Sequence, residues 1–303
     1  MLNRSLTDAL RGIAVLIIII CHFIGGGFEI RYFTPLGGIG VAIFLFLSGY
    51  GLNESFLAKG LNGFWTKKTL RILLPYLLWC GLLAITVLLL PYDSPAFRRY
   101  WYLEYLALWY AIFYFSKKFL PKYSELIMIV LAVCMFPFMR NIQTEQSFSF
   151  LLGVVVSGQK LKLEKINKWV LICTMVSVFT FGITCLFLKQ IHWFRAFGEE
   201  SFVVKLLQLG TKLPIGLSII IAVSYLYRSV FFWRIFEILG IVSLELYLVQ
   251  MPFPGYIQGD WMNLSKISLL VAVLTIILHF AVIGINALLK RIEWPRIKTN
   301  KQV

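Results

Sequence analysis

Apolar runs about as long as a membrane is thick recur along this 303-residue chain, and they constrain its fold more than any other feature. A helix needs about 20 such residues to cross the ~30 Å hydrocarbon layer, where every backbone polar group must be satisfied internally. Hydrophobic residues make up 59% of the sequence, against roughly 45–50% in a soluble domain. The sequence therefore predicts an all-α polytopic membrane protein with a single transmembrane domain over residues 1–303.

About ten runs are candidates for transmembrane helices. The sixth is short and contains Gly153 and Gly158, so a full crossing and a re-entrant segment both stay open. Residues 290–303 are predicted to form a basic cytoplasmic tail. The predicted spans are 7–24, 38–57, 70–90, 101–116, 124–139, 142–158, 168–188, 213–228, 236–253 and 267–289.

Positive charge supports this layout. A net charge of +15 would also attract a nucleic-acid backbone, but most of the Lys and Arg residues lie in short segments between apolar runs. Such residues collect on the cytoplasmic side of membrane proteins. We therefore expect both termini in the cytoplasm and no nucleic-acid partner. The longest segment placed outside, residues 189–212, is expected to be a loop.

The five cysteines lie within apolar runs and form no CxxC pair. This pattern is typical of buried small hydrophobic residues and not of a disulfide or zinc framework. We predict no metal site. The cysteines are Cys21, Cys80, Cys134, Cys173 and Cys185.

Few charged or titratable residues fall inside the predicted spans, and a charge at mid-bilayer costs about 2.5–3.5 kcal/mol on insertion scales. Arg11 and His22 are eleven residues apart, close to three helical turns, so both fall on one helix face about 16 Å apart. Asp8 lies three residues before Arg11 and can pair with it. It is about 21 Å from His22 along a helix, too far to orient that imidazole.

His22 is the candidate general base. An imidazole ordinarily titrates near pH 6.5, which suits removal of a hydroxyl proton at neutral pH. The other two histidines are less favourable, because His279 is alone in an apolar run and His192 is in a predicted loop. An interfacial or packing role is the alternative for His22.

Three cations lie at the cytoplasmic entry of the third predicted span, at the same expected membrane level as Arg11. Lys67, Lys68 and Arg71 could join Arg11 in holding phosphate groups. Inside-positive topology with contacts to anionic lipid headgroups explains the same residues. Spacing alone favours neither interpretation.

Several ordered motifs resemble the membrane-bound acyltransferase family 3, the O-acyltransferases of surface polysaccharides and related acceptors. The opening segment LTDALRGIA (6–14) followed by His22 is similar to the start of that family, including ten residues between Arg11 and the histidine. Further similar segments follow in the family's order: GVAIFLFLSGY (40–50), RILLPY (71–76), WYL (101–103) and SLELYLVQ (243–250).

Two positions depart from the family pattern. Ala42 stands where many members have an acidic residue, so no role is assigned to it. Gln250 stands where many have histidine, which argues against a second histidine at that position. The early Arg11 and His22 pair is intact, so the chain is not interpreted as an inactive relative.

The resemblance implies a bacterial cell-membrane enzyme that moves an acyl group, often acetyl, from cytoplasmic acyl-CoA to a hydroxyl of a glycan or lipid-linked saccharide. Acyl-CoA would be a co-substrate, and no cofactor would be permanently bound. Arg11, Arg71, Lys67 and Lys68 would hold the CoA phosphates.

His22 would remove the acceptor's proton or carry the acyl group itself, and the sequence does not separate these routes. Ser48 or a backbone amide at a span end could stabilise the oxyanion. Glu104 could orient His22 or bind a sugar hydroxyl, with packing or pairing to a cation as the alternative. Two other classes stay open: a transporter or flippase of an anionic substrate, which needs no CoA, and a non-enzymatic membrane scaffold.

Overall fold

A computed structural model describes residues 2–89, 100–159, 166–227 and 230–299, and these residues form helices and connecting turns without a strand. The prediction of an all-α chain is confirmed for this part. The chain forms two compact units, one from residues 1–62 and 100–241 and the other from residues 63–99 and 242–303. The prediction of one domain remains a prediction.

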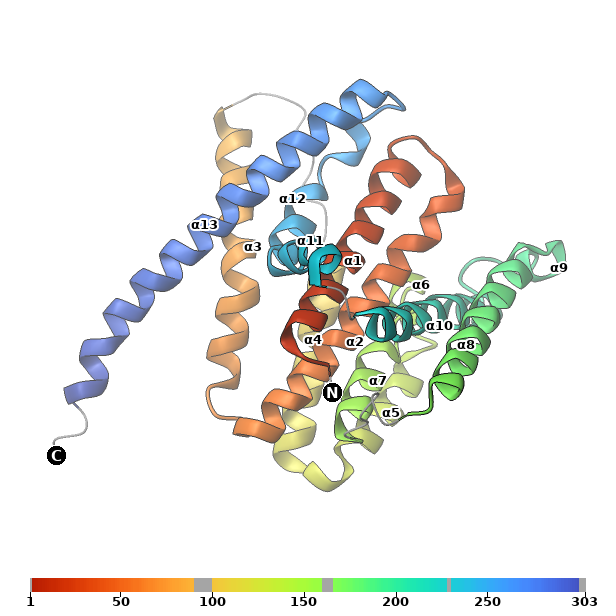
Figure 1. Ribbon diagram of the computed structural model, residues 1–303, viewed down its shortest axis with the longest axis horizontal. Helices are drawn as coiled ribbons and strands as arrows, with labels where there is room; N and C mark the ends of the chain where they lie inside the picture. Colours follow the sequence, from red (N-terminus) through yellow and green to blue (C-terminus); the bar gives the residue numbers. More distant parts are fainter. Residues whose placement is uncertain (1, 90–99, 160–165, 228–229, 300–303) are drawn as a thin grey trace. The chain divides into compact units, whose positions relative to one another are not determined.

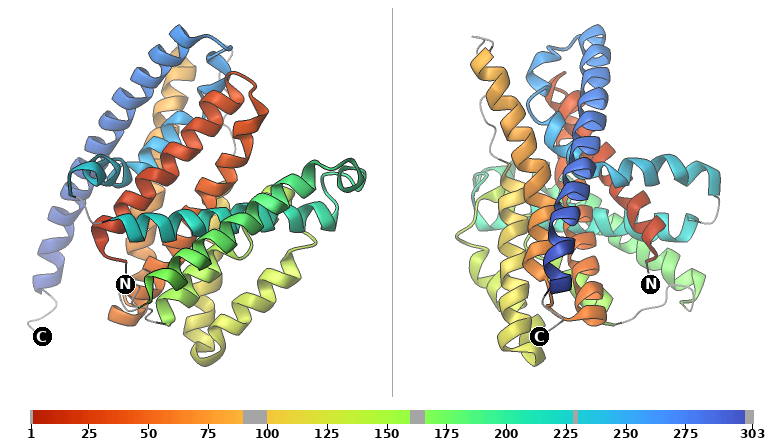
Figure 2. Two further views of the ribbon diagram at one scale, coloured as in Figure 1. Left: turned by 45° about the vertical axis from the view of Figure 1, so that its right-hand side comes forward. Right: turned by 90° about the vertical axis from the view of Figure 1, so that its left-hand side faces the viewer.

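The first unit is built around α1, α2 and α10. Helix α1 packs against α2 and α11, α2 packs against α7 and α10, and α8 lies along α10 (Figures 1 and 2). The helices of this unit are α1 (Arg4–Ile20), α2 (Thr34–Lys59), α4 (Trp101–Phe119), α5 (Ser124–Met135), α6 (Asn141–Thr144), α7 (Ser149–Gly158), α8 (Lys168–Gln190), α9 (His192–Arg195), α10 (Phe202–Leu226) and α11 (Val230–Ile241).

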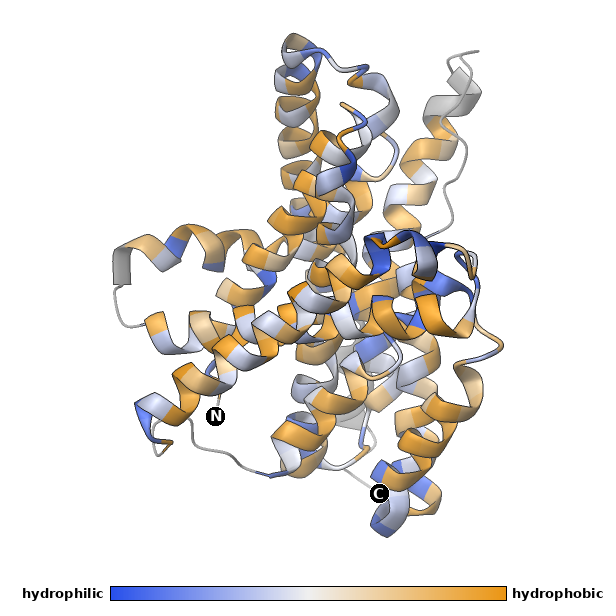
Figure 3. Ribbon diagram, turned by 90° about the vertical axis from the view of Figure 1, so that its right-hand side faces the viewer, coloured by the Kyte–Doolittle hydropathy of each residue, from blue (hydrophilic) through white to orange (hydrophobic). Residues whose placement is uncertain are grey.

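In the second unit, α3 packs with two helices that lie far from it in the sequence, near the C-terminal end. Helices α3 (Phe64–Leu89), α12 (Ser243–Gln250) and α13 (Trp261–Thr299) all contact one another. Helix α13 has 39 residues, and hydrophobic residues occupy most of the long helices of both units (Figure 3). Large apolar side chains such as Leu269 and Phe280 on α13 are exposed, as expected for helices that face lipid.

Glycines bring pairs of helices into backbone contact in the first unit. A Cβ atom on Gly12 of α1 would lie 2.0 Å from the Phe236 carbonyl oxygen of α11, and one on Gly240 would lie 1.8 Å from that of Asp8. The same close approach joins α2 to α7 at Gly49 and Gly153. Small residues at helix contacts are characteristic of membrane helix packing, where close van der Waals contact drives association.

Six helical segments are long and apolar enough to cross a membrane, within the part of the chain that the structure describes. The ten-span count and the cytoplasmic termini are not confirmed. Helices α5, α7, α11 and α12 have 12, 10, 12 and 8 residues, and at 1.5 Å per residue even 12 residues span only about 18 Å. The six segments are Arg4–Gly26, Arg31–Lys59, Phe64–Ile85, Lys168–Gln190, Phe202–Leu226 and Trp261–Leu289.

The predicted loop over residues 189–212 is wrong in its second half. Helix α10 begins at Phe202, where the Ser201 side chain caps it by accepting a hydrogen bond from the Val204 amide at 3.3 Å. Lys205 and Lys212 are therefore helical, and both are buried. Hydropathy places the start of this helix too late because two lysines interrupt its apolar pattern.

The prediction that all five cysteines are buried is also wrong. Cys185 is buried and Cys21 and Cys80 are half-buried, but Cys134 and Cys173 are exposed. A thiol on the outer face of an apolar helix is compatible with lipid, so an apolar run does not by itself imply burial in the protein.

Candidate functional site

Arg11 and His22 lie on one continuous helical segment, Arg4–Gly26. The Asn3 side chain caps its start by accepting a hydrogen bond from the Leu6 amide at 2.7 Å. The prediction of one helix through both residues is confirmed, whereas their common face stays a prediction, because it assumes α-helical periodicity and His22 lies in a π-helical turn. Arg11 and His22 belong to one continuous segment, so the depth of Arg11 along the helix axis fixes the depth of His22.

His22 lies in a π-helical turn, Cys21–Gly26, that follows α1 directly. Its carbonyl accepts a hydrogen bond from the Gly27 amide at 3.1 Å, and its side chain is half-buried. Single π-helical turns within α-helices occur frequently at functional sites. Three consecutive glycines, Gly25 to Gly27, leave the end of this turn without side-chain bulk.

Asp8 pairs with Arg11, which confirms the predicted interaction. Its Oδ1 accepts a hydrogen bond from Arg11 Nη1 at 2.8 Å, and its Oδ2 lies 3.8 Å from Arg4 Nε. The Arg11 side chain is 22% exposed, whereas that of Arg4 is 95% exposed. The half-buried guanidinium is therefore held by a carboxylate one turn away on its own helix.

Ser48 lies at a different level from His22. Helices α1 and α2 run antiparallel: a Cβ on Gly40 would lie 2.6 Å from Ile18, and one on Gly37 would lie 2.8 Å from the Cys21 thiol. Ser48 is eight residues beyond Gly40, or roughly 12 Å along α2. This places it near the level of Arg11 and does not favour its predicted role as an oxyanion donor beside His22.

The predicted phosphate-binding cations divide between the two units. Arg11 belongs to the first, whereas Lys67, Lys68 and Arg71 lie on the first two turns of α3 in the second. Arg71 is exposed and Lys68 is half-buried, while the Lys67 side chain lies outside the described residues. The spacing of Lys67, Lys68 and Arg71 puts them on one side of α3, and the cradle of all four cations stays a prediction.

Glu104 lies in the first turn of α4, where its side chain is exposed. A carboxylate at a helix N-terminus is favoured by the helix dipole. The helix dipole therefore explains an acidic residue at this position without a role in catalysis. Its roles in orienting His22 or binding a sugar stay predictions.

Buried charges that the sequence analysis missed lie near the His22 segment. Glu145, from the turn between α6 and α7, and Lys212, from α10, are each 7% exposed and attract one another electrostatically. With its amide nitrogen toward Glu145, Gln208 donates to Oε2 at 2.8 Å and accepts from Lys189 Nζ at 2.8 Å. The signal available in the sequence was the N-cap Ser201, which would have placed Lys212 inside a helix.

His279 is not alone, contrary to the prediction. Its Nδ1 lies 3.0 Å from Glu245 Oε1, which joins α13 to α12 in the second unit. The Glu245 side chain is 8% exposed and that of His279 is 21% exposed. Their separation of 34 residues hides the contact from any local sequence pattern.

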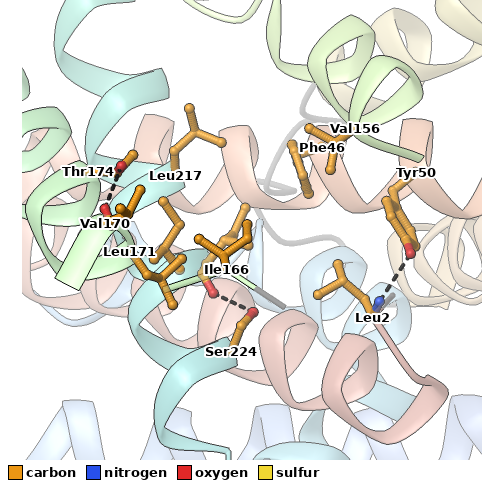
Figure 4. A pocket seen from close by; sticks show the side chains of 12 residues that line it. Leu2, Phe46, Tyr50, Val156, Ile166, Val170, Leu171, Thr174, Leu217 and Ser224 are labelled. Atoms are coloured by element: carbon orange, nitrogen blue, oxygen red, sulfur yellow. Dashed lines mark hydrogen bonds between the residues drawn. The ribbon is translucent and has the colours of Figure 1, made fainter. Parts of the chain in front are cut away.

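A cavity of about 260 Å³ opens in the first unit between α2, α7, α8 and α10 (Figure 4). Its lining is almost entirely apolar, with Phe46, Leu171 and Ile221 among its residues. At one edge, the Leu2 amide donates to the Tyr50 hydroxyl at 3.0 Å. Such a surface suits an alkyl chain and offers no charge for CoA phosphates, so it does not form the predicted phosphate site.

The fold and this arrangement define a helical membrane protein with an arginine and a histidine on its first apolar helix. The model of a family described as "Acyltransferase domain" matches residues 7–289. The chain therefore belongs to acyltransferase family 3 and is a membrane acyltransferase. Comparisons with curated proteins and with solved structures gave no match.

Proposed function

We propose that the protein is an O-acyltransferase that moves an acyl group, such as acetyl, from cytoplasmic acyl-CoA to a hydroxyl of a glycan or lipid-linked saccharide. The observation that carries the proposal is the single helical segment that bears both Arg11 and His22. Arg11, held by Asp8, is suited to a CoA phosphate, and the acyl-pantetheine arm would extend along the same helix toward the imidazole. A bacterial cell membrane is the proposed location.

In the proposed reaction, His22 accepts the proton of the acceptor hydroxyl as the hydroxyl oxygen attacks the thioester carbonyl. The new C–O bond forms, and the C–S bond breaks as the tetrahedral intermediate collapses. The CoA sulfur leaves with the bonding electron pair and takes the proton from His22. The products are the ester and the free CoA thiol, and His22 returns to its neutral form.

The experiment is acyl transfer by the purified protein with radiolabelled acetyl-CoA, measured as CoA release with and without candidate glycans. His22→Ala should lower turnover by about 10²–10⁴-fold, the usual contribution of a general base. His192→Ala is the matched control, because His192 is exposed on the short helix α9. Its turnover should equal that of wild type.

Full turnover by His22→Ala, in protein with an unchanged unfolding temperature, would exclude His22 as the base. If the wild type neither bound nor consumed acetyl-CoA or longer acyl donors, the transporter alternative would replace the proposal. A transporter moves its substrate without breaking a thioester, so uptake into vesicles without CoA would identify it.

A further inference from the structure

Glu145 and Lys212 are two opposite charges kept inside the first unit. Burying an ionic group is expensive unless it is paired and hydrogen-bonded, and a well-packed apolar pair is often equally stable. The Glu145 and Lys212 pair therefore adds little to folding stability. The contacts of the two side chains indicate a different role for the pair.

Both side chains act on the first turn of α2. Lys212 Nζ donates to the Pro35 carbonyl at 3.0 Å, and Gln146 Nε2, 3.5 Å from Glu145 Oε1, donates to the Gly38 carbonyl at 2.8 Å. A Cβ on Gly38 would lie 2.6 Å from Glu145 Oε1 and 2.9 Å from Lys212 Cδ. We call Glu145, Gln146 and Lys212 the clamp: Lys212 and Gln146 donate to two carbonyls of one turn, and Glu145 accepts from Gln146 and lies against Gly38.

The same turn supports the π-helical turn that carries His22. The Cys21 thiol donates to the Thr34 carbonyl at 3.4 Å. A Cβ on Gly37 would lie 2.8 Å from the Cys21 sulfur, and one on Gly25 would lie 3.3 Å from Phe33 Cβ. The Phe33–Gly38 stretch thus contacts the His22 segment and is bonded by the clamp.

We propose that Glu145 and Lys212 are positioning residues for His22, acting through the first turn of α2. The catalytic part of this inference rests on the proposed function. A base must stay within hydrogen-bond reach of the acceptor, and a displacement of about 1 Å costs roughly 10²-fold in rate. A charged clamp holds the turn more firmly than neutral hydrogen bonds would.

Lys205 provides a matched control on the same helix. It is 5% exposed, and its Nζ donates to the Met139 carbonyl at 2.8 Å and lies 3.2 Å from Glu200. It is therefore a second buried, bonded lysine of α10, but neither of its partners belongs to α2. A purely structural role would give Lys205→Met and Lys212→Met the same effects.

The first test uses Cys21 as a reporter of its segment and needs no turnover. In a variant with the other four cysteines replaced by alanine, maleimide should alkylate Cys21 about tenfold faster in the double variant Glu145→Gln/Lys212→Met, the expected effect of losing a charged hydrogen bond. This variant removes two opposite charges near the thiol together, whereas Lys212→Met alone also removes a positive charge that promotes the reaction and should increase the rate less. Lys205→Met and Lys212→Arg should leave the rate close to that of the parent variant.

The second test is acyl transfer by the same variants with all cysteines retained. Lys212→Met should lower kcat by at least tenfold with little change in the KM for acyl-CoA, and Lys212→Arg should recover most of the loss. Unchanged Cys21 labelling in both clamp variants, or equal effects of Lys205→Met and Lys212→Met, would overturn the proposal. Changed labelling in a protein that consumes no acyl-CoA would support the clamp and reject the proposed function instead.

Discussion

Arg11 shows how a cation is accommodated within the first apolar helix. Its 2.8 Å bond to Asp8 is local, and Arg4 shares the same carboxylate at the longer distance of 3.8 Å. The carboxylate orients the guanidinium and offsets part of its charge. If Arg11 binds a CoA phosphate, its contribution is expected to be to binding more than to the chemical step.

Arg11→Ala should therefore raise the KM for acyl-CoA about tenfold to hundredfold and change kcat much less, because a hydrogen bond to a charged group contributes about 1.5–3 kcal/mol. Steady-state kinetics with varied acyl-CoA measure both constants. Arg4→Ala is the control, since Arg4 lies on the same helix but is exposed, and its KM should stay within about twofold of wild type. Equal effects of the two substitutions would contradict a specific phosphate contact.

In the second unit, Glu245 and His279 form a contact between two ionisable groups, as Asp8 and Arg11 do in the first. It crosses between α12 and α13, and Glu245 is nearly buried. An ionisable group within an apolar segment is normally retained with a partner. Replacing one of the two residues should therefore destabilise the protein more than replacing both.

A double-mutant cycle tests this expectation. His279→Leu should lower the unfolding temperature in detergent more than Glu245→Leu/His279→Leu does, because the single variant leaves a buried carboxyl without its partner. The coupling energy should be about 1–2 kcal/mol. Additive effects of the two substitutions would show that the 3.0 Å contact does not contribute to stability.

At the scale of helices, the glycine contacts decide which elements can approach. Gly12 and Gly240 place the backbones of α1 and α11 against one another, beside the Asp8–Arg11 pair. Added volume at such a contact cannot be absorbed by a side-chain rotation, since the opposing atoms are backbone. The close packing of α1 against α11 therefore requires glycine at both positions.

Gly12→Ala and Gly240→Ala should each destabilise the protein by about 1–3 kcal/mol, the usual cost of overpacking. Gly51 on α2 is the control, because a Cβ there would meet no atom within 4 Å. Gly51→Ala should be neutral or stabilising by up to about 1 kcal/mol, since alanine favours helix. Thermal unfolding in detergent measures all three, and tolerance of alanine at Gly12 would argue against the close α1–α11 contact.

At the scale of the whole chain, neighbours in sequence are divided between units. Helix α3 lies between α2 and α4 in sequence, yet it packs with α12 and α13. The family-like segments at 6–14, 40–50 and 101–103 belong to the first unit, and those at 71–76 and 243–250 belong to the second. The number of membrane crossings is a property of the whole chain, and it depends on whether the stretches that contain short helices cross the membrane.

Accessibility labelling tests the ten-span prediction at one of its short helices, α5, in the predicted span 124–139. In a cysteine-free background, the layout predicts that Arg140→Cys reacts with an impermeant maleimide in intact cells and that Lys122→Cys reacts only after permeabilisation. Both residues are exposed. Reaction of both from the same side would show that residues 124–139 do not cross and would reduce the count.

The sequence by itself determined the helical membrane class, the family, the helix that bears Arg11 and His22, and the bond between Asp8 and Arg11. These features depend on segment length, composition and separations of a few turns, which one helix fixes through its geometry. The start of α10 was within reach through its Ser201 cap.

Only the tertiary structure decided which residues surround that helix. It places Ser48 near the level of Arg11, brings Lys212 to the turn that supports His22, and joins Glu245 to His279. The last two contacts link residues 177 and 34 positions apart. Helix propensity and hydropathy act over one or two turns, whereas these neighbours are selected by the packing of whole helices.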